Sequence, residues 1–195
     1  MRSLVDDLQP RRTVLLGHSM GGMVAQECVA RGSQGVAADG LVLACTSAAF
    51  GKADGEWQAR FVAERLAPLD RGLGMAGMAA RLVPGLVSPR APAVALEIAT
   101  EVMAAVPETT YRAALRAIVG FDRRSALPAI AVPTLLLAAE HDGTAPPEVM
   151  QRMAARIPGA GYTCLAGAGH IANVEQPAAF NAAVVTFLQR NFPVP

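Results

Sequence analysis

The chain has 195 residues, a length typical of one domain and sufficient to bury a sizeable core. Hydrophobic residues make up 52% and charged residues 17% of it, which excludes an intrinsically disordered chain. The formal net charge is +1, without any run of Lys or Arg, so we expect no nucleic-acid-binding surface.

The sequence also indicates the cellular compartment in which we expect the protein. No stretch reaches the roughly 18 apolar residues that a membrane span requires, and residues 1–12 lack the continuous apolar segment of a signal peptide. Cys28, Cys45 and Cys164 are far apart and show no metal-binding spacing. We therefore expect buried thiols in a reducing cytoplasm, no membrane partner, and neither a metal nor an organic cofactor.

Short apolar runs alternate with helical spacing in the N-terminal part. The pattern predicts the end of a helix over 2–9, a strand over 13–16, a helix over 20–31 and a strand over 41–45. Residues 50–125 differ, because they are rich in Ala, Met and Arg. We expect three or four short helices there, with the helical spacing broken at Pro68, Gly72, Gly74, Pro84, Gly85, Pro89 and Pro107.

After Pro133 the first pattern returns. It predicts a strand over 134–139, a helix opened by Pro146-Pro147 and running to about 157, a strand over 162–165 and a closing helix over 177–190. Strands separated by helices indicate an α/β protein with a mostly parallel sheet covered on both faces. We expect a core of residues 1–49 and 126–195, with residues 50–125 forming a helical cap over the carboxyl edge of the sheet.

One motif carries the chemistry. Gly17-His18-Ser19-Met20-Gly21 matches G-x-S-x-G and lies between an apolar strand and a helix. Such a turn strains the serine and exposes its hydroxyl, and side chains at Gly17 and Gly21 would collide in it. The Met20 N–H, at the start of the helix, is then placed to stabilise the oxyanion that forms when Ser19 attacks a carbonyl. A tight glycine turn without chemistry is the alternative.

Three histidines are candidates for the base of Ser19. His18 abuts the serine and points elsewhere in such a turn, so we interpret it as a structural or pocket-lining residue. His141 lies beside the expected acid, which leaves His170, in a glycine-rich loop after the last strand. The alternative for His170 is an ordinary loop histidine.

The base needs a carboxylate that fixes its tautomer and stabilises its charged form. Asp142 follows the third core strand at its carboxyl end, and an Asp that merely forms a turn before Gly143 is the alternative. Glu140 is the second choice, because it would end the strand and could face away.

On these residues the chain resembles the α/β-hydrolase superfamily, with matching stretches at 14–22, 133–142 and 167–170. The order Ser19, Asp142, His170 also agrees with that superfamily. Residues 146–149, residues 167–177 and the run 41–48 followed by Trp57 are similar to 3-oxoadipate enol-lactonases. Related esterases and cofactor-free haloperoxidase-like proteins share much of this pattern.

The chain also departs from the superfamily. Members carry several strands and a His-Gly oxyanion loop before the nucleophile strand, whereas this chain has 16 residues before Gly17 and no His-Gly pair. We therefore expect a partial α/β-hydrolase fold with an open edge at 13–16 and an oxyanion hole that lacks its second donor. Losing one such donor typically costs about 10²–10³ in rate. Our hypothesis is a coding sequence truncated at an internal Met1, which upstream codons would test.

The resemblance implies a serine hydrolase that cleaves a small ester or lactone through an acyl-enzyme, with 3-oxoadipate enol-lactone as the expected substrate. Its carboxylate would need a cation. Cap arginines are the candidates, and a solvated helix charge is the favoured alternative for each: Arg60, Arg65, Arg81, Arg112 and Arg116. Trp57 either lines the pocket or packs the cap. The alternatives are carboxylester hydrolysis or perhydrolysis by the same residues, and an inert fragment without the oxyanion loop.

Overall fold

A single parallel sheet organises the protein. The computed structural model describes residues 2–31, 35–51 and 55–193. Within them, the sheet order is β1 (Val14–His18), β2 (Gly40–Ala44), β3 (Thr134–Ala139) and β4 (Gly161–Leu165). All three strand pairs are parallel. Each strand lies within two residues of its predicted range, which confirms the α/β prediction.

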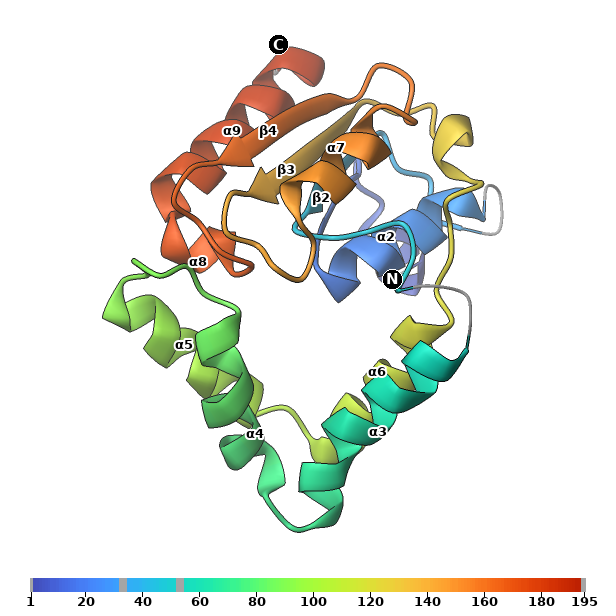
Figure 1. The fold of residues 1–195 in the computed structure, drawn as a ribbon. Helices are drawn as coiled ribbons and strands as arrows, with labels where there is room; N and C mark the ends of the chain where they lie inside the picture. The colour runs from blue at the N-terminus through green and yellow to red at the C-terminus, as the bar shows by residue number, and fades with distance from the viewer. Residues whose placement is uncertain (1, 32–34, 52–54, 194–195) are drawn as a thin grey trace.

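Helices cover both faces of this sheet (Figure 1). The flanking helices are α1 (Arg2–Leu8), α2 (Met20–Ala30), α7 (Pro147–Ala154), α8 (Ala172–Glu175) and α9 (Pro177–Asn191). α2 and α7 pack on one face and α9 on the other. α7 ends earlier than the predicted 157, because tighter turns lead directly into Pro158. No helix in the described ranges has the length and apolar character that crossing a membrane requires.

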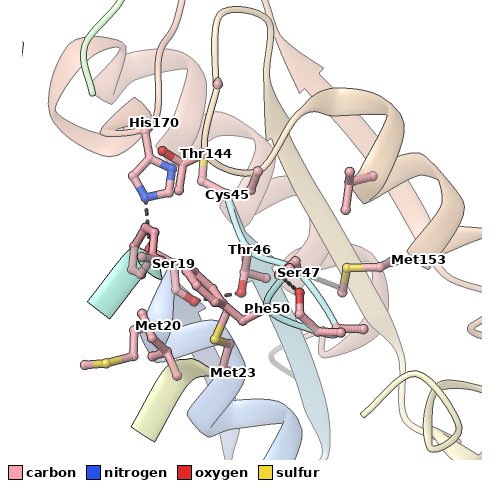
Figure 2. A pocket seen from close by; sticks show the side chains of 18 of the residues that line it. Ser19, Met20, Met23, Cys45, Thr46, Ser47, Phe50, Thr144, Met153 and His170 are labelled. Atoms are coloured by element: carbon pink, nitrogen blue, oxygen red, sulfur yellow. Dashed lines mark hydrogen bonds between the residues drawn. The ribbon is translucent and has the colours of Figure 1, made fainter. Parts of the chain in front are cut away.

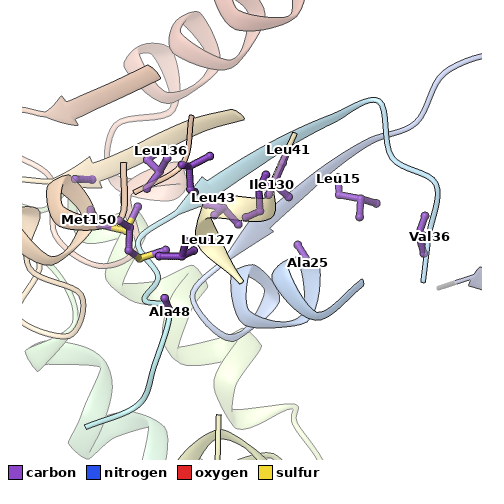
Figure 3. Packing of buried hydrophobic residues seen from close by; sticks show 13 residues of the cluster. Leu15, Ala25, Val36, Leu41, Leu43, Ala48, Leu127, Ile130, Leu136 and Met150 are labelled. Atoms are coloured by element: carbon purple, nitrogen blue, oxygen red, sulfur yellow. The ribbon is translucent and has the colours of Figure 1, made fainter. Parts of the chain in front are cut away.

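The two central strands form the most deeply buried part of the chain. Every residue of β2 and β3 is buried, as expected for strands covered on both faces. On the α2 and α7 side, Leu41, Leu43 and Leu136 are 0% exposed and pack with Leu127 and Met150 (Figure 3). Burying each such side chain contributes about 1.5–3 kcal/mol, so this layer holds the carboxyl edge of the sheet rigidly.

Between β2 and β3 the chain forms a helical insert. Its helices are α3 (Glu56–Asp70), α4 (Gly74–Leu82), η2 (Val83–Gly85), α5 (Ala93–Ala104) and α6 (Glu108–Val119), and η3 (Leu127–Ala129) follows as the chain returns to the sheet. α3 packs beside α6, and α4 beside α5 (Figure 1). The predicted break at Pro68 is wrong, because α3 continues through this residue. Pro68 is buried beside Leu69 near the end of α3, and this packing offsets the missing backbone N–H.

The insert leaves and rejoins the sheet layer at neighbouring points. Ala49 and Asp122 form an antiparallel bridge, in which Phe50 N–H donates to Phe121 O and Arg123 N–H donates to Ala48 O. This neck lies close to the predicted boundaries of the cap at residues 50 and 125. The division into core and cap stays a prediction.

Candidate active site

Ser19 occupies a strained turn between β1 and α2. Its φ and ψ are 51° and −121°, a left-handed φ that non-glycine residues rarely adopt. The Ser19 N–H donates to Ala44 O of β2 at 2.9 Å, and the Thr46 hydroxyl donates to Ser19 O at 2.7 Å. Both bonds fix the turn to the end of β2, so the side chain of Ser19 is held at the carboxyl edge of the sheet.

Two glycines make this turn possible. A Cβ on Gly17 would lie 2.3 Å from Gly21 O, so the predicted collision holds at Gly17. The same expectation is wrong for Gly21, where an added Cβ meets nothing within 4 Å. The second crowded position is Gly22, whose Cβ would lie 2.6 Å from the Thr46 methyl group. The collision is with the segment after β2, which the local motif does not describe.

The structure brings Ser19, His170 and Asp142 together. His170 Nε2 lies 2.9 Å from Ser19 Oγ (Figure 2). On the other side of the ring, His170 Nδ1 lies 2.9 Å from Asp142 Oδ2. Asp142 follows β3, and His170 follows β4, so the carboxyl ends of three parallel strands supply the three groups. This arrangement has the connectivity of a nucleophile, a base and an orienting acid.

Asp142 is held ready to orient the imidazole. Its Oδ1 accepts the N–H groups of Thr144 and Ala145, which leaves Oδ2 for His170. Burial alone would raise the pKa of Asp142, but the hydrogen bond and charge of His170 and the two N–H groups outweigh burial and lower it. The carboxyl group is therefore ionised at neutral pH and accepts the Nδ1–H.

The other candidates for base and acid lie outside this arrangement. His18 Nε2 is 2.6 Å from His170 O, so its ring supports the His170 loop. Burial is the main cause that lowers the pKa of His18, which favours a neutral ring that donates Nε2–H. His141 is exposed, and Glu140 Oε2 accepts Gly167 N–H at 2.8 Å. Glu140 contacts the loop of His170 but not its ring.

The predicted oxyanion donor is the backbone N–H of Met20. Met20 follows Ser19 as the first residue of α2, and it lines the same cavity as Ser19 and His170. In the described part of the chain, none of the hydrogen bonds uses this N–H. A helix N-terminus leaves such donors free for a ligand.

A cavity of about 900 Å³ opens in front of Ser19, between the sheet edge and the insert. Trp57 lines it, and the indole also stacks on Phe61 and contacts Phe50. Met20, Met23 and Phe50 cover the wall beside Ser19 (Figure 2). The cavity is thus mainly apolar, with the reactive group on one side.

Arg60, the predicted contact for a substrate carboxylate, is exposed and does not line this cavity. Trp57, Phe61 and Arg65 recur every four residues along α3, and all three line the cavity. Arg65 lines the cavity and lies over the Phe61 ring, with its Cζ 5.1 Å from the ring centroid. None of the ion pairs within residues 2–31, 35–51 and 55–193 involves Arg65.

Several residues that line the cavity were not predicted from the sequence. Arg124, Arg152 and Arg156 also line the cavity, but nothing in their local sequence indicates a site. Cys45, another lining residue, is 1% exposed. Burial, followed by the charge of Asp142, raises its pKa, so the thiol stays protonated and does not compete with Ser19 as nucleophile. Across the described residues, no group of His, Cys, Asp and Glu side chains has the arrangement of a metal site.

Comparisons with known proteins agree with this geometry. Residues 1–183 match a family described as the alpha/beta hydrolase family. A thermophilic esterase from Thermogutta terrifontis is 30% identical, with a TM-score of 0.82, and the match covers 96% of this chain and 69% of the esterase. The enol-lactonase from Burkholderia xenovorans LB400 is 29% identical, with a TM-score of 0.81, and the match covers 95% of this chain and 69% of the lactonase.

Among curated sequences, RutD of Caulobacter vibrioides is 34% identical over 93 residues. This stretch covers 48% of the present chain but only 35% of RutD, so the chain matches about a third of that relative's length. The family match, in contrast, spans most of the chain, and the fold and residue order agree with it. The chain belongs to the alpha/beta hydrolase family.

Proposed function

We propose that the chain is a serine hydrolase that cleaves a small ester or lactone through an acyl-enzyme. One observation carries the proposal: Ser19 Oγ and Asp142 Oδ2 lie 2.9 Å from opposite nitrogens of His170, beside a cavity of about 900 Å³. A cavity of this size holds a small organic substrate. The membership of the family supports the same reaction class.

The proposed reaction uses these groups in turn. His170 Nε2 takes the proton of Ser19 as Oγ forms a bond to the substrate carbonyl, and Asp142 stabilises the resulting imidazolium. The Met20 N–H donates to the carbonyl oxygen as it becomes negative. The C–O bond of the ester then breaks, and His170 gives its proton to the leaving oxygen. Water, deprotonated by His170, attacks the acyl-enzyme and releases the acid and Ser19.

The finer proposal is that the substrate is 3-oxoadipate enol-lactone. The likeness to an enol-lactonase at 29% identity supports it. Arg65 supports it as well, because its guanidinium, which has no acidic partner among the described residues, lines the same mainly apolar cavity as Ser19. A substrate carboxylate would complete a charge-assisted pair with Arg65. We also propose that residues 50–125 form a cap that determines this choice.

A second candidate is hydrolysis of simple carboxylesters, which the likeness to an esterase at 30% identity favours. The third is an inert fragment, favoured by the single identified oxyanion donor, Met20. Perhydrolysis has weaker support, because the solved bromoperoxidases are 22% and 17% identical and thus share the fold alone.

The test is covalent labelling of the purified chain by a fluorophosphonate, which reacts with an activated serine. We expect labelling of the wild type and its loss in Ser19→Ala. Ser47→Ala is the matched control, because Ser47 lines the same cavity while its hydroxyl donates to Ala49 O. This variant should label at the wild-type rate.

Turnover then separates the substrates. A kcat/KM at least about tenfold higher for the enol-lactone than for p-nitrophenyl acetate, lost in Arg65→Gln, supports the finer proposal. The opposite preference supports the carboxylesterase. A folded wild type that neither labels nor turns over either substrate would contradict the hydrolase proposal and support the inert fragment.

A further inference from the structure

Beside the base, a buried carboxyl group joins two segments that are far apart in the sequence. Glu175, the last residue of α8, is 3% exposed. Its Oε1 accepts Gly169 N–H at 3.0 Å, and its Oε2 accepts Ser88 N–H at 2.7 Å. The side chain therefore connects the residue before His170 to the segment between η2 and α5.

The two segments that Glu175 connects are in close backbone contact. His170 N–H donates to Leu86 O at 2.8 Å. A Cβ on Gly169 would lie 2.5 Å from Ser88 N and 2.7 Å from Val87 C, so only glycine permits this approach. The His170 loop thus packs directly against the insert. The Glu175 carboxylate accepts one N–H from each side of this contact, at Gly169 and at Ser88.

The placement of Glu175 is costly, which argues for a specific role. Burying a carboxyl group is unfavourable unless hydrogen bonds compensate. No ion pair within the described ranges includes Glu175, so the N–H groups of Gly169 and Ser88 are its compensation. An amide of the same size would not replace it, because its NH₂ group would face one of the two N–H donors.

The backbone of His170 is held on both sides. Its N–H is bound by Leu86, and its C=O accepts the Nε2–H of His18, which precedes the nucleophile. Asp142 then fixes only the ring. The 2.9 Å distance between His170 Nε2 and Ser19 Oγ therefore depends on the position of the His170 loop. Glu175 fixes this loop to the insert.

We propose that Glu175 is a positioning residue for His170. It holds the imidazole within reach of Ser19 and couples that position to residues 86–88 of the insert. This inference rests on the proposed hydrolase function, in which His170 is the base. Because Glu175 does not face the cavity, it acts on the chemical step and not on substrate binding.

The experiment uses Glu175→Gln in the full chain, with turnover expressed per active site titrated by the fluorophosphonate. We expect kcat and the rate constant for labelling Ser19 to fall about 10- to 100-fold, since small displacements of a catalytic group cost this much. KM should stay within about twofold of the wild type. Glu140→Gln is the matched control, because Glu140 also accepts an N–H of this loop, at Gly167, but is exposed. Its kcat should equal that of the wild type.

If Glu175 has only a structural role, the fluorophosphonate should titrate fewer active sites in Glu175→Gln, while kcat per titrated site stays unchanged. That result overturns the inference. If Glu175→Gln does not fold, Glu175→Asp keeps the carboxyl group with a shorter reach and should also lower kcat per site. An unchanged kcat in Glu175→Asp overturns the inference equally. A wild type without labelling contradicts the proposed function itself, whereas an active wild type with fully active Glu175 variants contradicts only this inference.

Discussion

At the scale of single residues, Gly17 is the position of the nucleophile turn that leaves the least space for a side chain. A methyl group there would approach Gly21 O to 2.3 Å, so the strand and the helix would have to move apart. We expect Gly17→Ala to destabilise the protein by about 1–3 kcal/mol, as overpacking does. Ser19 labelling per folded molecule should also fall. Urea unfolding and fluorophosphonate labelling measure the two effects.

Gly21→Ala is the control for this prediction. No atom lies within 4 Å of the added Cβ, and residue 21 belongs to α2, where Ala is favoured over Gly. Stability and labelling of Gly21→Ala should therefore match or exceed those of the wild type. Equal losses in both variants would mean that the turn does not depend on close approach at Gly17.

The sequence could predict residues whose role follows from chain order. Ser19, Asp142 and His170 each follow a strand, and parallel strands bring their carboxyl ends together, so their meeting is predictable. That Arg60 does not line the cavity could not be predicted, because composition does not say which face of α3 meets the cavity. Glu175 could not be predicted as a contact of Ser88, because 87 residues separate them and only the packed insert brings them together.

At the scale of elements, β1 is one of the two edge strands of the described sheet, since it pairs with β2 on one side only. Leu16 on β1 is 48% exposed, and such an edge favours association between chains. We expect Leu16→Lys to reduce concentration-dependent association, with a stability change within about 0.5 kcal/mol. Light scattering over a concentration series and urea unfolding measure both quantities.

Leu15→Lys is the matched control on the same strand. Leu15 is 8% exposed and packs in the cluster under α2 and α7, so a lysine there should destabilise the protein strongly. If Leu16→Lys destabilised the protein as much as Leu15→Lys, the side chain of Leu16 would be buried in solution, contrary to the structure.

The strands were predictable as elements because β2 and β3 are short, continuous apolar runs, the pattern of strands buried on both faces. The helices of the insert were harder. Pro68 is a helix breaker by local preference, yet α3 includes it, because burial beside Leu69 outweighs one missing hydrogen bond. Local rules omit such tertiary compensation.

At the scale of the whole molecule, His18 links stability to pH. Its pKa is lowered from 6.5, mainly by burial. Between the folded pKa and pH 6.5, His18 is therefore mostly protonated in the unfolded chain and mostly neutral in the folded chain. Stability is therefore complete above pH 6.5 and falls as the pH drops toward the folded pKa, by at most about 1.4 kcal/mol per pH unit. We expect His18→Gln to flatten this dependence in urea unfolding between pH 7.5 and 5.5.

The control for the pH dependence is His141→Gln, since His141 is exposed. This variant should retain the wild-type slope of unfolding free energy against pH. An unchanged slope in His18→Gln would show that His18 binds its proton equally in both states.

The neck at Ala49 and Asp122 has a consequence for how such a protein changes over evolution. Because the chain departs and returns at adjacent points, the length of what lies between them adds little entropic cost, about 0.6 kcal/mol for each doubling. The intervening segment can therefore be replaced as a unit, while Ser19, Asp142 and His170 stay in the turn and loops that follow the strands. Such a transplant would alter which molecules are accepted and retain the reaction, provided that the new segment supplies an N–H partner for Glu175.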